Sequence, residues 1–162
     1  PMPLDPDFVA DCPYGPGALL IAEILEVDRE ASRVRVRMPT ADDLPITEAQ
    51  RVHPERHPRH VAGGLMVHMT GIVGFVHAYY VLDLRHAEGW IGYGTRIHDA
   101  RFSALATPGA PLELEGGATR VRRLRGQLFV RYRFAFRQGE VVVYEGDQSA
   151  AWTKVDGASS AA

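Results

Sequence analysis

Strict alternation of apolar and polar residues marks two segments of the chain as half-buried strands. In residues 33–38 (RVRVRM), Val34, Val36 and Met38 alternate with arginines. Residues 127–137 (QLFVRYRFAFR) repeat this pattern over a longer run. Side chains two residues apart lie on the same face of a strand. Each segment therefore predicts a strand with one apolar face in the core and one arginine-rich face towards solvent.

Four further segments have the composition and length of strands. They are residues 19–27 (LLIAEILEV), 90–102 (WIGYGTRIHDARF), 112–124 (LELEGGATRVRRL) and 140–152 (EVVVYEGDQSAAW). Turn residues separate several of them, at 28–31, at 107–111 (TPGAP) and at 138–139. The pattern predicts two strands early in the chain and three or four antiparallel strands late in it.

The longest apolar run in the chain predicts one buried helix. Between Gly63 and Leu84 only His68, Thr70, His77 and Asp83 are polar. A helix of that length spans about 33 Å, and a helix that is apolar on nearly all sides is buried rather than laid on the surface. Strands on either side of one core helix predict an α+β domain.

A membrane span is the alternative for this run, because about 20 apolar residues can cross a bilayer. Two histidines and four glycines weaken the segment as a span. The rest of the chain also supplies alternating strands that can wrap a buried helix. The sequence therefore favours a core helix and no membrane span.

Proline and glycine divide the rest of the chain. Residues 1–17 predict an irregular N-terminal lead-in, residues 18–155 a single domain, and residues 156–162 a disordered tail. Residues 40–60 have no periodicity and predict a loop of about 20 residues. Loops of that length in compact domains are uncommon and often functional.

Composition agrees with one folded domain. The chain has 162 residues, of which 46% are hydrophobic and 23% charged, so disordered, collagen-like and coiled-coil classes are excluded. A net charge of −2 gives no bulk attraction to nucleic acid. Cys12 is the only cysteine and cannot form an internal disulfide, and no signal peptide is visible. These features predict a cytoplasmic protein.

Three segments carry a family resemblance. Residues 62–68 (AGGLMVH) align with the end of the pattern H-F-P-G-x-P-x-x-P-G-x-x-x-x-E, and residues 97–115 (IHDARFSALATPGAPLELE) with A-R-F-x-x-x-V-x-P-G-D-x-L. Residues 123–147 are similar to the closing hairpin of the same family. The chain thus resembles the hotdog-fold superfamily, and within it the 3-hydroxyacyl-acyl-carrier-protein dehydratases. The resemblance covers residues 19–152.

The resemblance implies a fold and an activity. The expected fold is an antiparallel sheet wrapped around one long central helix. The expected activity is on acyl thioesters, carried by coenzyme A or by an acyl-carrier protein, with a 3-hydroxyacyl-thioester dehydratase (a lyase) as the first expectation. An acyl-thioester hydrolase (thioesterase) and a non-catalytic acyl-binding subunit are the alternatives. Family members build their acyl tunnel between two protomers, so a homodimer or higher homo-oligomer is expected.

Histidines and glycines are the candidate site residues. The family's acidic helix residue falls on His68, and its loop histidine falls beside His53, with His57 close in sequence. Histidine suits acid–base chemistry near neutral pH. Gly63 and Gly64 lie where a helix begins, so their N–H groups can stabilise the thioester oxygen. We expect no cofactor and no metal, because Pro58 interrupts the helical turn that a His-x-x-x-His metal pair needs.

Arginine is concentrated late in the chain. Residues 120–137 hold seven arginines and no acid. Solvated outer faces of two strands explain most of them. Four of them are also candidates for binding the phosphates of coenzyme A or of a carrier protein: Arg120, Arg122, Arg123 and Arg125. Nucleic acid is not expected, because the neighbouring aromatic side chains point to the opposite, core-facing side.

Overall fold

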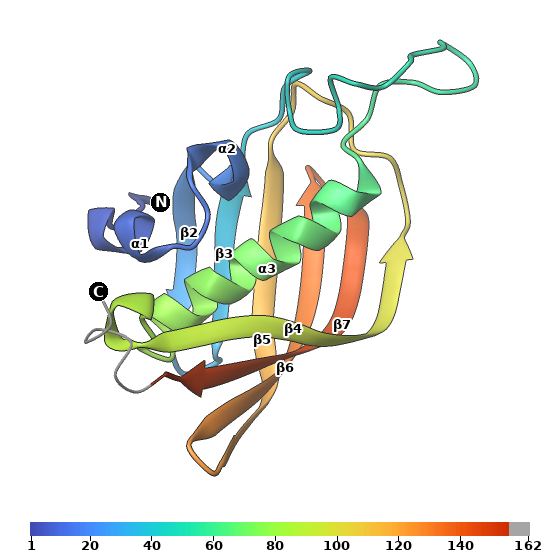
Figure 1. Cartoon of the computed structure of the whole chain (residues 1–162). Coiled ribbons are helices and arrows are strands. Elements are labelled where there is room, and N and C mark those ends of the chain that lie inside the picture. Colours follow the sequence, from blue (N-terminus) through green and yellow to red (C-terminus); the bar gives the residue numbers. More distant parts are fainter. Residues whose placement is uncertain (156–162) are drawn as a thin grey trace.

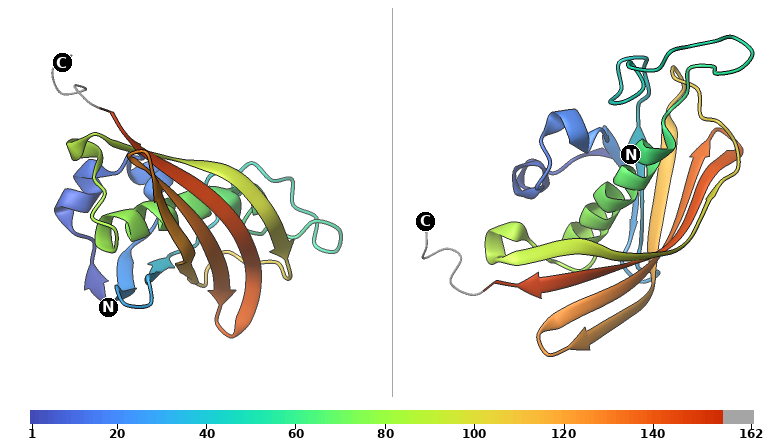
Figure 2. Two further views of the ribbon diagram at one scale, coloured as in Figure 1. Left: turned by 90° about the horizontal axis from the view of Figure 1, so that it is seen from below. Right: turned by 45° about the vertical axis from the view of Figure 1, so that its right-hand side comes forward.

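A computed structural model describes residues 1–155 as one long helix lying across a curved antiparallel sheet (Figures 1 and 2). The seven strands run in the order β1-β2-β3-β5-β6-β7-β4. They are β1 (Met2–Pro3), β2 (Glu23–Asp28), β3 (Arg33–Met38), β4 (Trp90–Phe102), β5 (Leu112–Leu124), β6 (Gln127–Gln138) and β7 (Val141–Lys154). The helices are α1 (Pro6–Asp11), α2 (Pro16–Leu19), α3 (Gly63–Tyr80) and the 3-10 turn η1 (His86–Glu88). The predicted α+β class is confirmed.

Alternation along the strands places the core between α3 and the sheet. Val34, Val36 and Met38 of β3 are fully buried, as are the alternate side chains of β6 from Leu128 to Phe136. The apolar helix α3 covers them with residues such as Ile72. The half-buried strands predicted from period-two alternation are therefore confirmed.

The outer face of β3 carries an ion-pair ladder. Arg33 contacts Glu26 of β2 at 3.0 Å, and Arg35 contacts Glu113 of β5 at 3.4 Å. Arg37 pairs with Glu23. These pairs are partly exposed, and each contributes at most about 1 kcal/mol to stability. They account for three of the arginines in this arginine-rich chain.

A glycine lets α3 approach the middle of the sheet. A Cβ on Gly116 of β5 would stand 2.6 Å from Val73 Cγ1 of α3, so a larger residue there would force neighbouring atoms to shift. The strand keeps regular pairing here, and its register shift lies later, between Ala118 and Arg120. The tight packing fixes how deep α3 lies on the sheet.

The N-terminal segment is more ordered than the sequence predicts, and the irregular lead-in is wrong for part of residues 1–17. Asp5 caps α1 by accepting a hydrogen bond from Asp7 N at 2.9 Å. Phe8 of α1 is buried against the ring of Tyr79. The buried contact of Phe8 with Tyr79, which a local pattern does not reveal, holds this short helix.

Two predicted boundaries also move. The strand predicted from residue 19 begins only at Glu23, because Pro16 starts α2 and Leu20 ends it in the left-handed region (φ 59°). The predicted helix ends at Tyr80 rather than Leu84. Arg29 holds this end by donating to the Tyr80 carbonyl at 2.7 Å.

Within residues 1–155, no helix is both long enough and apolar enough to span a membrane. The tail that the sequence predicts to be disordered, residues 156–162, lies outside the described residues.

Candidate active site

The start of α3 presents two unpartnered backbone donors. Ala62 is the N-cap residue and provides no side-chain cap. Its carbonyl accepts from Leu65 N and Met66 N, while the N–H groups of Gly63 and Gly64 have no backbone acceptor among the described residues. The chain entering the helix is held by Val61 N, which donates to the Ala106 carbonyl at 2.8 Å. Free N–H groups at the positive end of a helix stabilise a developing negative charge.

Phe102 lies beside these donors. It is the last residue of β4, it is 55% exposed, and its ring packs 5.2 Å from the ring of Tyr144. A Cβ on Gly63 would stand 2.9 Å from Phe102 Cε1, so the glycine permits this close approach. The sequence reasoning did not select Phe102, although it belongs to the quoted segment ARF.

His68 lies one helical turn after Gly64 on the same face of α3. Its Nε2 is 2.8 Å from the Ala18 carbonyl oxygen, and its ring stacks edge-on with Tyr14 at 4.8 Å. A carbonyl only accepts hydrogen bonds, so Nε2 carries the proton. In the neutral ring Nδ1 is then an acceptor, and it has no hydrogen-bond partner within residues 1–155. The ring of His68 therefore lies near the start of α3, against Tyr14 and the Ala18 carbonyl.

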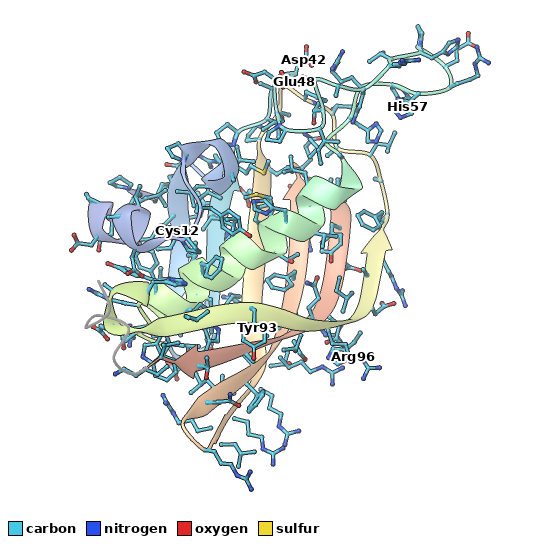
Figure 3. All side chains as sticks on the ribbon, viewed as in Figure 1. Cys12, Asp42, Glu48, His57, Tyr93 and Arg96 are labelled. Carbon is cyan, nitrogen blue, oxygen red and sulfur yellow. The ribbon has the colours of Figure 1, made fainter. Side chains whose placement is uncertain are left out.

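The loop histidines lie apart from His68 within one chain. The backbones of His53 and His57 exchange hydrogen bonds of 2.8 and 2.9 Å, closing a small loop beyond the start of α3 (Figure 3). His53 Nδ1 accepts from Glu55 N and Arg56 N. The structure therefore brings His68 near Gly64, and it gives neither loop histidine a hydrogen bond to His68.

A small, mostly apolar pocket opens between α3 and the sheet. It has a volume of about 80 Å³. It is lined by helix residues from Thr70 to Phe75, by Gly92, Tyr93 and Gly94 of β4, and by residues of β6 and β7 that include Phe134 and Trp152. Thr70 lies about 10 Å along the helix axis from Gly63. The pocket is suited to an apolar chain whose head lies at the helix start.

The polar groups in this pocket satisfy one another. Gln148 Nε2 donates to Thr70 Oγ1 at 3.0 Å, and Tyr144 donates to Gln148 Oε1 at 2.5 Å. Thr70 in turn donates to the Val67 carbonyl at 2.6 Å. The sequence reasoning missed this relay, because its members come from α3 and β7 and share no local motif.

His77 is a buried structural residue. Its Nδ1 is 2.8 Å from the Tyr132 hydroxyl and its Nε2 is 2.9 Å from Ser32 Oγ. Burial lowers the pKa of His77 to about 4, and the contact with Ser32 opposes this only in part. The hydroxyl of the buried Tyr132 must donate to Nδ1, because it has no other hydrogen-bond partner among the described residues. His77 is thus neutral, with its Nε2–H directed at Ser32.

The four candidate arginines separate in the structure. Arg120 and Arg122 are paired with Arg131 and Phe129 of β6 and share the outer face of the sheet. Arg123 is paired with the inward-facing Leu128, and Arg125 lies in the β5–β6 turn. All four are exposed, and none belongs to an ion pair within the described part of the chain. The hairpin they occupy lies at the end of the sheet away from the start of α3 (Figure 1).

Among residues 1–155, no three histidine, cysteine, aspartate or glutamate side chains converge as metal ligands would.

Comparison with solved structures identifies the fold. No protein-family model and no curated protein sequence matches the chain. A mutant of the fluoroacetyl-CoA-specific thioesterase FlK matches with a TM-score of 0.60 and 18% identity, over 80% of this chain and 90% of that one. A thioesterase from Haemophilus influenzae matches with a TM-score of 0.58 and 14% identity, over 90% of this chain and 87% of that one.

A third structure agrees. A phenylacetic acid degradation-related protein from Ralstonia eutropha, described as a putative thioesterase, matches with a TM-score of 0.58 and 18% identity, over 83% of this chain and 86% of that one. Similarity at this level of identity establishes the fold. The hotdog fold predicted from the sequence is confirmed. The similar structures do not specifically support the resemblance to dehydratases.

Proposed function

We propose that this protein is an acyl-thioester hydrolase. The observation that carries the proposal is the start of α3, where the N–H groups of Gly63 and Gly64 have no backbone acceptor among the described residues and His68 follows Gly64 by one turn, with no partner on Nδ1 within residues 1–155. The apolar pocket further along the helix then receives the acyl chain. One site thus offers an oxyanion donor pair, a base and an acyl pocket.

The reaction needs one base and one water molecule. His68 Nδ1 removes a proton from water as its oxygen attacks the thioester carbonyl carbon. The carbonyl oxygen becomes an oxyanion that accepts from Gly63 N–H and Gly64 N–H. The C–S bond breaks, and the protonated His68 returns its proton to the leaving thiolate. The products are a carboxylic acid and a free thiol.

Hydrolysis is better supported than the dehydration that the sequence suggested first. Dehydration needs a base for the α-proton and a proton donor for the β-hydroxyl. Of the candidate histidines His68, His53 and His57, only His68 is placed on α3 near its start, since His53 and His57 bond inside their own loop. Three structures of the same fold are thioesterases or described as putative thioesterases, which supports the same choice.

A homodimer is part of the proposal. Within residues 1–155, β4 pairs only with β7, so the other edge of this 13-residue strand has no neighbouring strand there. Its exposed apolar side chains include Tyr93, Ile97 and Phe102. Free strand edges invite pairing with another chain, and a second copy joined there would continue the sheet. The partner's loop would then be free to bring His53 or His57 to this site.

The proposed substrate is an acyl-coenzyme A. Two FlK structures are complexes with coenzyme A or acetyl-CoA, which supports this carrier over an acyl-carrier protein. The cysteine of the chain is free, in keeping with a reducing cytoplasm as the place of the reaction.

An assay with defined thioesters tests the function. The purified protein is incubated with saturated and 3-hydroxyacyl-CoA of several chain lengths, and free thiol and enoyl product are followed in parallel. We expect free thiol from both substrate types and no enoyl product. Enoyl product without thiol would overturn hydrolysis in favour of dehydration, and neither product would favour a non-catalytic acyl-binding subunit.

A further inference from the structure

A groove of about 400 Å³ crosses the outer face of the sheet, on the side away from α3. It runs from β5 across β6 and β7 to β4. Its principal lining residues are Arg120, Arg122, Phe129, Arg131, His98 and Ser149. We call it the outer-face groove. Its arginines and Phe129 lie outside the site at the start of α3 and its acyl pocket, whereas Ser149 lines both the groove and that pocket.

The groove carries uncompensated positive charge. Arg120 and Arg122 have no acidic partner within residues 1–155, whereas Arg131 is held by Asp147 through contacts of 2.9 Å. The arginines of β3 on the same face all have glutamate partners. The guanidinium groups of Arg120 and Arg122 therefore differ from those of β3 on the same face, which are paired with glutamates.

Two of these arginines face each other across neighbouring strands. Arg120 of β5 is the direct cross-strand partner of Arg131 of β6. Like charges placed directly opposite in a sheet destabilise it. An anion bound between them removes that repulsion, and a guanidinium group binds phosphate oxygens in a bidentate manner.

An exposed aromatic ring adjoins the arginines. Phe129 is 37% exposed and is the direct cross-strand partner of Arg122. The ring therefore offers a flat apolar surface next to a cation. At the other side of the groove His98 Nε2 and Ser149 Oγ lie 2.7 Å apart and add two polar groups. This combination fits a ligand with phosphate groups and a flat ring.

We propose that the outer-face groove binds the phosphate-bearing end of an adenine nucleotide. Arg120 and Arg122 contact the phosphate oxygens, and Phe129 stacks on the base. Free adenine nucleotides and the nucleotide end of coenzyme A share this chemistry. The proposal that coenzyme A is the ligand of this groove rests on the proposed hydrolase function. The proposal that a free nucleotide is the ligand does not.

Titration calorimetry of the full chain with ADP, coenzyme A and inorganic pyrophosphate tests the site. We expect saturable binding at one site per chain, with ADP at least about fivefold tighter than pyrophosphate because the base stacks. Arg120→Gln and Arg122→Gln each weaken ADP binding at least about tenfold. Phe129→Leu weakens ADP binding and leaves pyrophosphate binding unchanged.

The matched control is Arg137→Gln, which removes the same charge from the same face of β6, about 20 Å from Arg131. It leaves ADP binding within twofold. Equal weakening by this control, or no saturable binding of any of the three probes, overturns the site. Coenzyme A binding at least about tenfold tighter than ADP identifies coenzyme A as the source, and equal affinity identifies the free nucleotide. His68→Ala retains binding, so loss of hydrolysis and loss of this site are distinguishable.

Discussion

The ring of Phe102 lies against the first residue of α3, where a Cβ on Gly63 would stand 2.9 Å from Phe102 Cε1. The contact joins the end of the edge strand β4 to the start of the central helix. The helix donors are thereby bordered on one side by an aromatic ring, which restricts how water and an acyl group can approach them.

Gly63→Ala is expected to lower kcat/KM for acyl-CoA hydrolysis at least about tenfold. The added methyl group forces the partly exposed Phe102 ring to move, which costs about 1 kcal/mol in stability. Steady-state hydrolysis and thermal unfolding measure the two effects. Gly63→Ala combined with Phe102→Ala serves as the control, because no ring remains to be displaced and the two changes should not add. Unchanged kcat/KM in Gly63→Ala would remove the helix start from the mechanism.

His68→Gln is expected to reduce kcat by about 10² or more, because the base is lost. The glutamine amide can still donate to the Ala18 carbonyl, so the fold is retained and the thermal unfolding midpoint changes little. His86→Gln is a control at another half-buried histidine, and it should leave kcat within about twofold. Activity that survives in His68→Gln would contradict the assigned role.

Mixed dimers distinguish where the loop histidines act. If His57 serves the partner's site, a dimer of one His68→Ala chain and one His57→Ala chain has one intact site. After statistical exchange of an equal mixture about half of the dimers are mixed, so about a quarter of the wild-type activity returns. The same mixture prepared with His53→Ala tests the other loop histidine. Each homodimer is inactive in this scheme. No recovery in a mixture whose dimers are shown to have exchanged, by native mass spectrometry with one of the two chains tagged, would mean that the loop acts within its own chain or not at all.

Gly74→Leu is expected to shorten the acyl chain that the protein accepts. No atom lies within 4 Å of a Cβ at Gly74, so the leucine side chain enters the pocket of about 80 Å³. Hydrolysis of the longest accepted acyl-CoA should fall at least about tenfold relative to acetyl-CoA. Gly17→Leu, equally free of neighbours but on α2, should leave the chain-length profile unchanged. An unchanged profile in Gly74→Leu would exclude this pocket as the acyl site.

His77 makes stability depend on pH in a defined window. Its pKa is about 4 in the folded protein, below the ordinary value of 6.5, so the unfolded chain binds more protons between these values. The free energy of unfolding should therefore decrease by about 3 kcal/mol as the pH falls from 6.5 to 4. Urea denaturation across this range measures the slope. His77→Gln should flatten it, whereas His57→Gln, at an exposed loop residue, should not.

Local patterns predicted much of the sheet. Residues 33–38 are a strand at the predicted bounds because alternation there reports burial directly, and residues 112–124 are a strand at the bounds predicted from their composition and length. Helix α1 escaped prediction because its stability depends on Phe8 packing against Tyr79, far away in the sequence. Gly63, Gly64 and His68 could be selected because they adjoin one helix start. Phe102 and the relay from Tyr144 through Gln148 to Thr70 could not, because only the folded sheet brings them to α3.

The two-sided hydrogen bonding of His77 has a consequence for the other histidine of α3. His68 precedes His77 by nine residues, and at 3.6 residues per turn the two side chains point in directions about 180° apart. Ser32 and Tyr132 form hydrogen bonds with the two ring nitrogens of His77, and these bonds oppose rotation of α3 about its own axis. The orientation of α3 about its axis is thus fixed near His77. In that orientation His68 points away from the sheet.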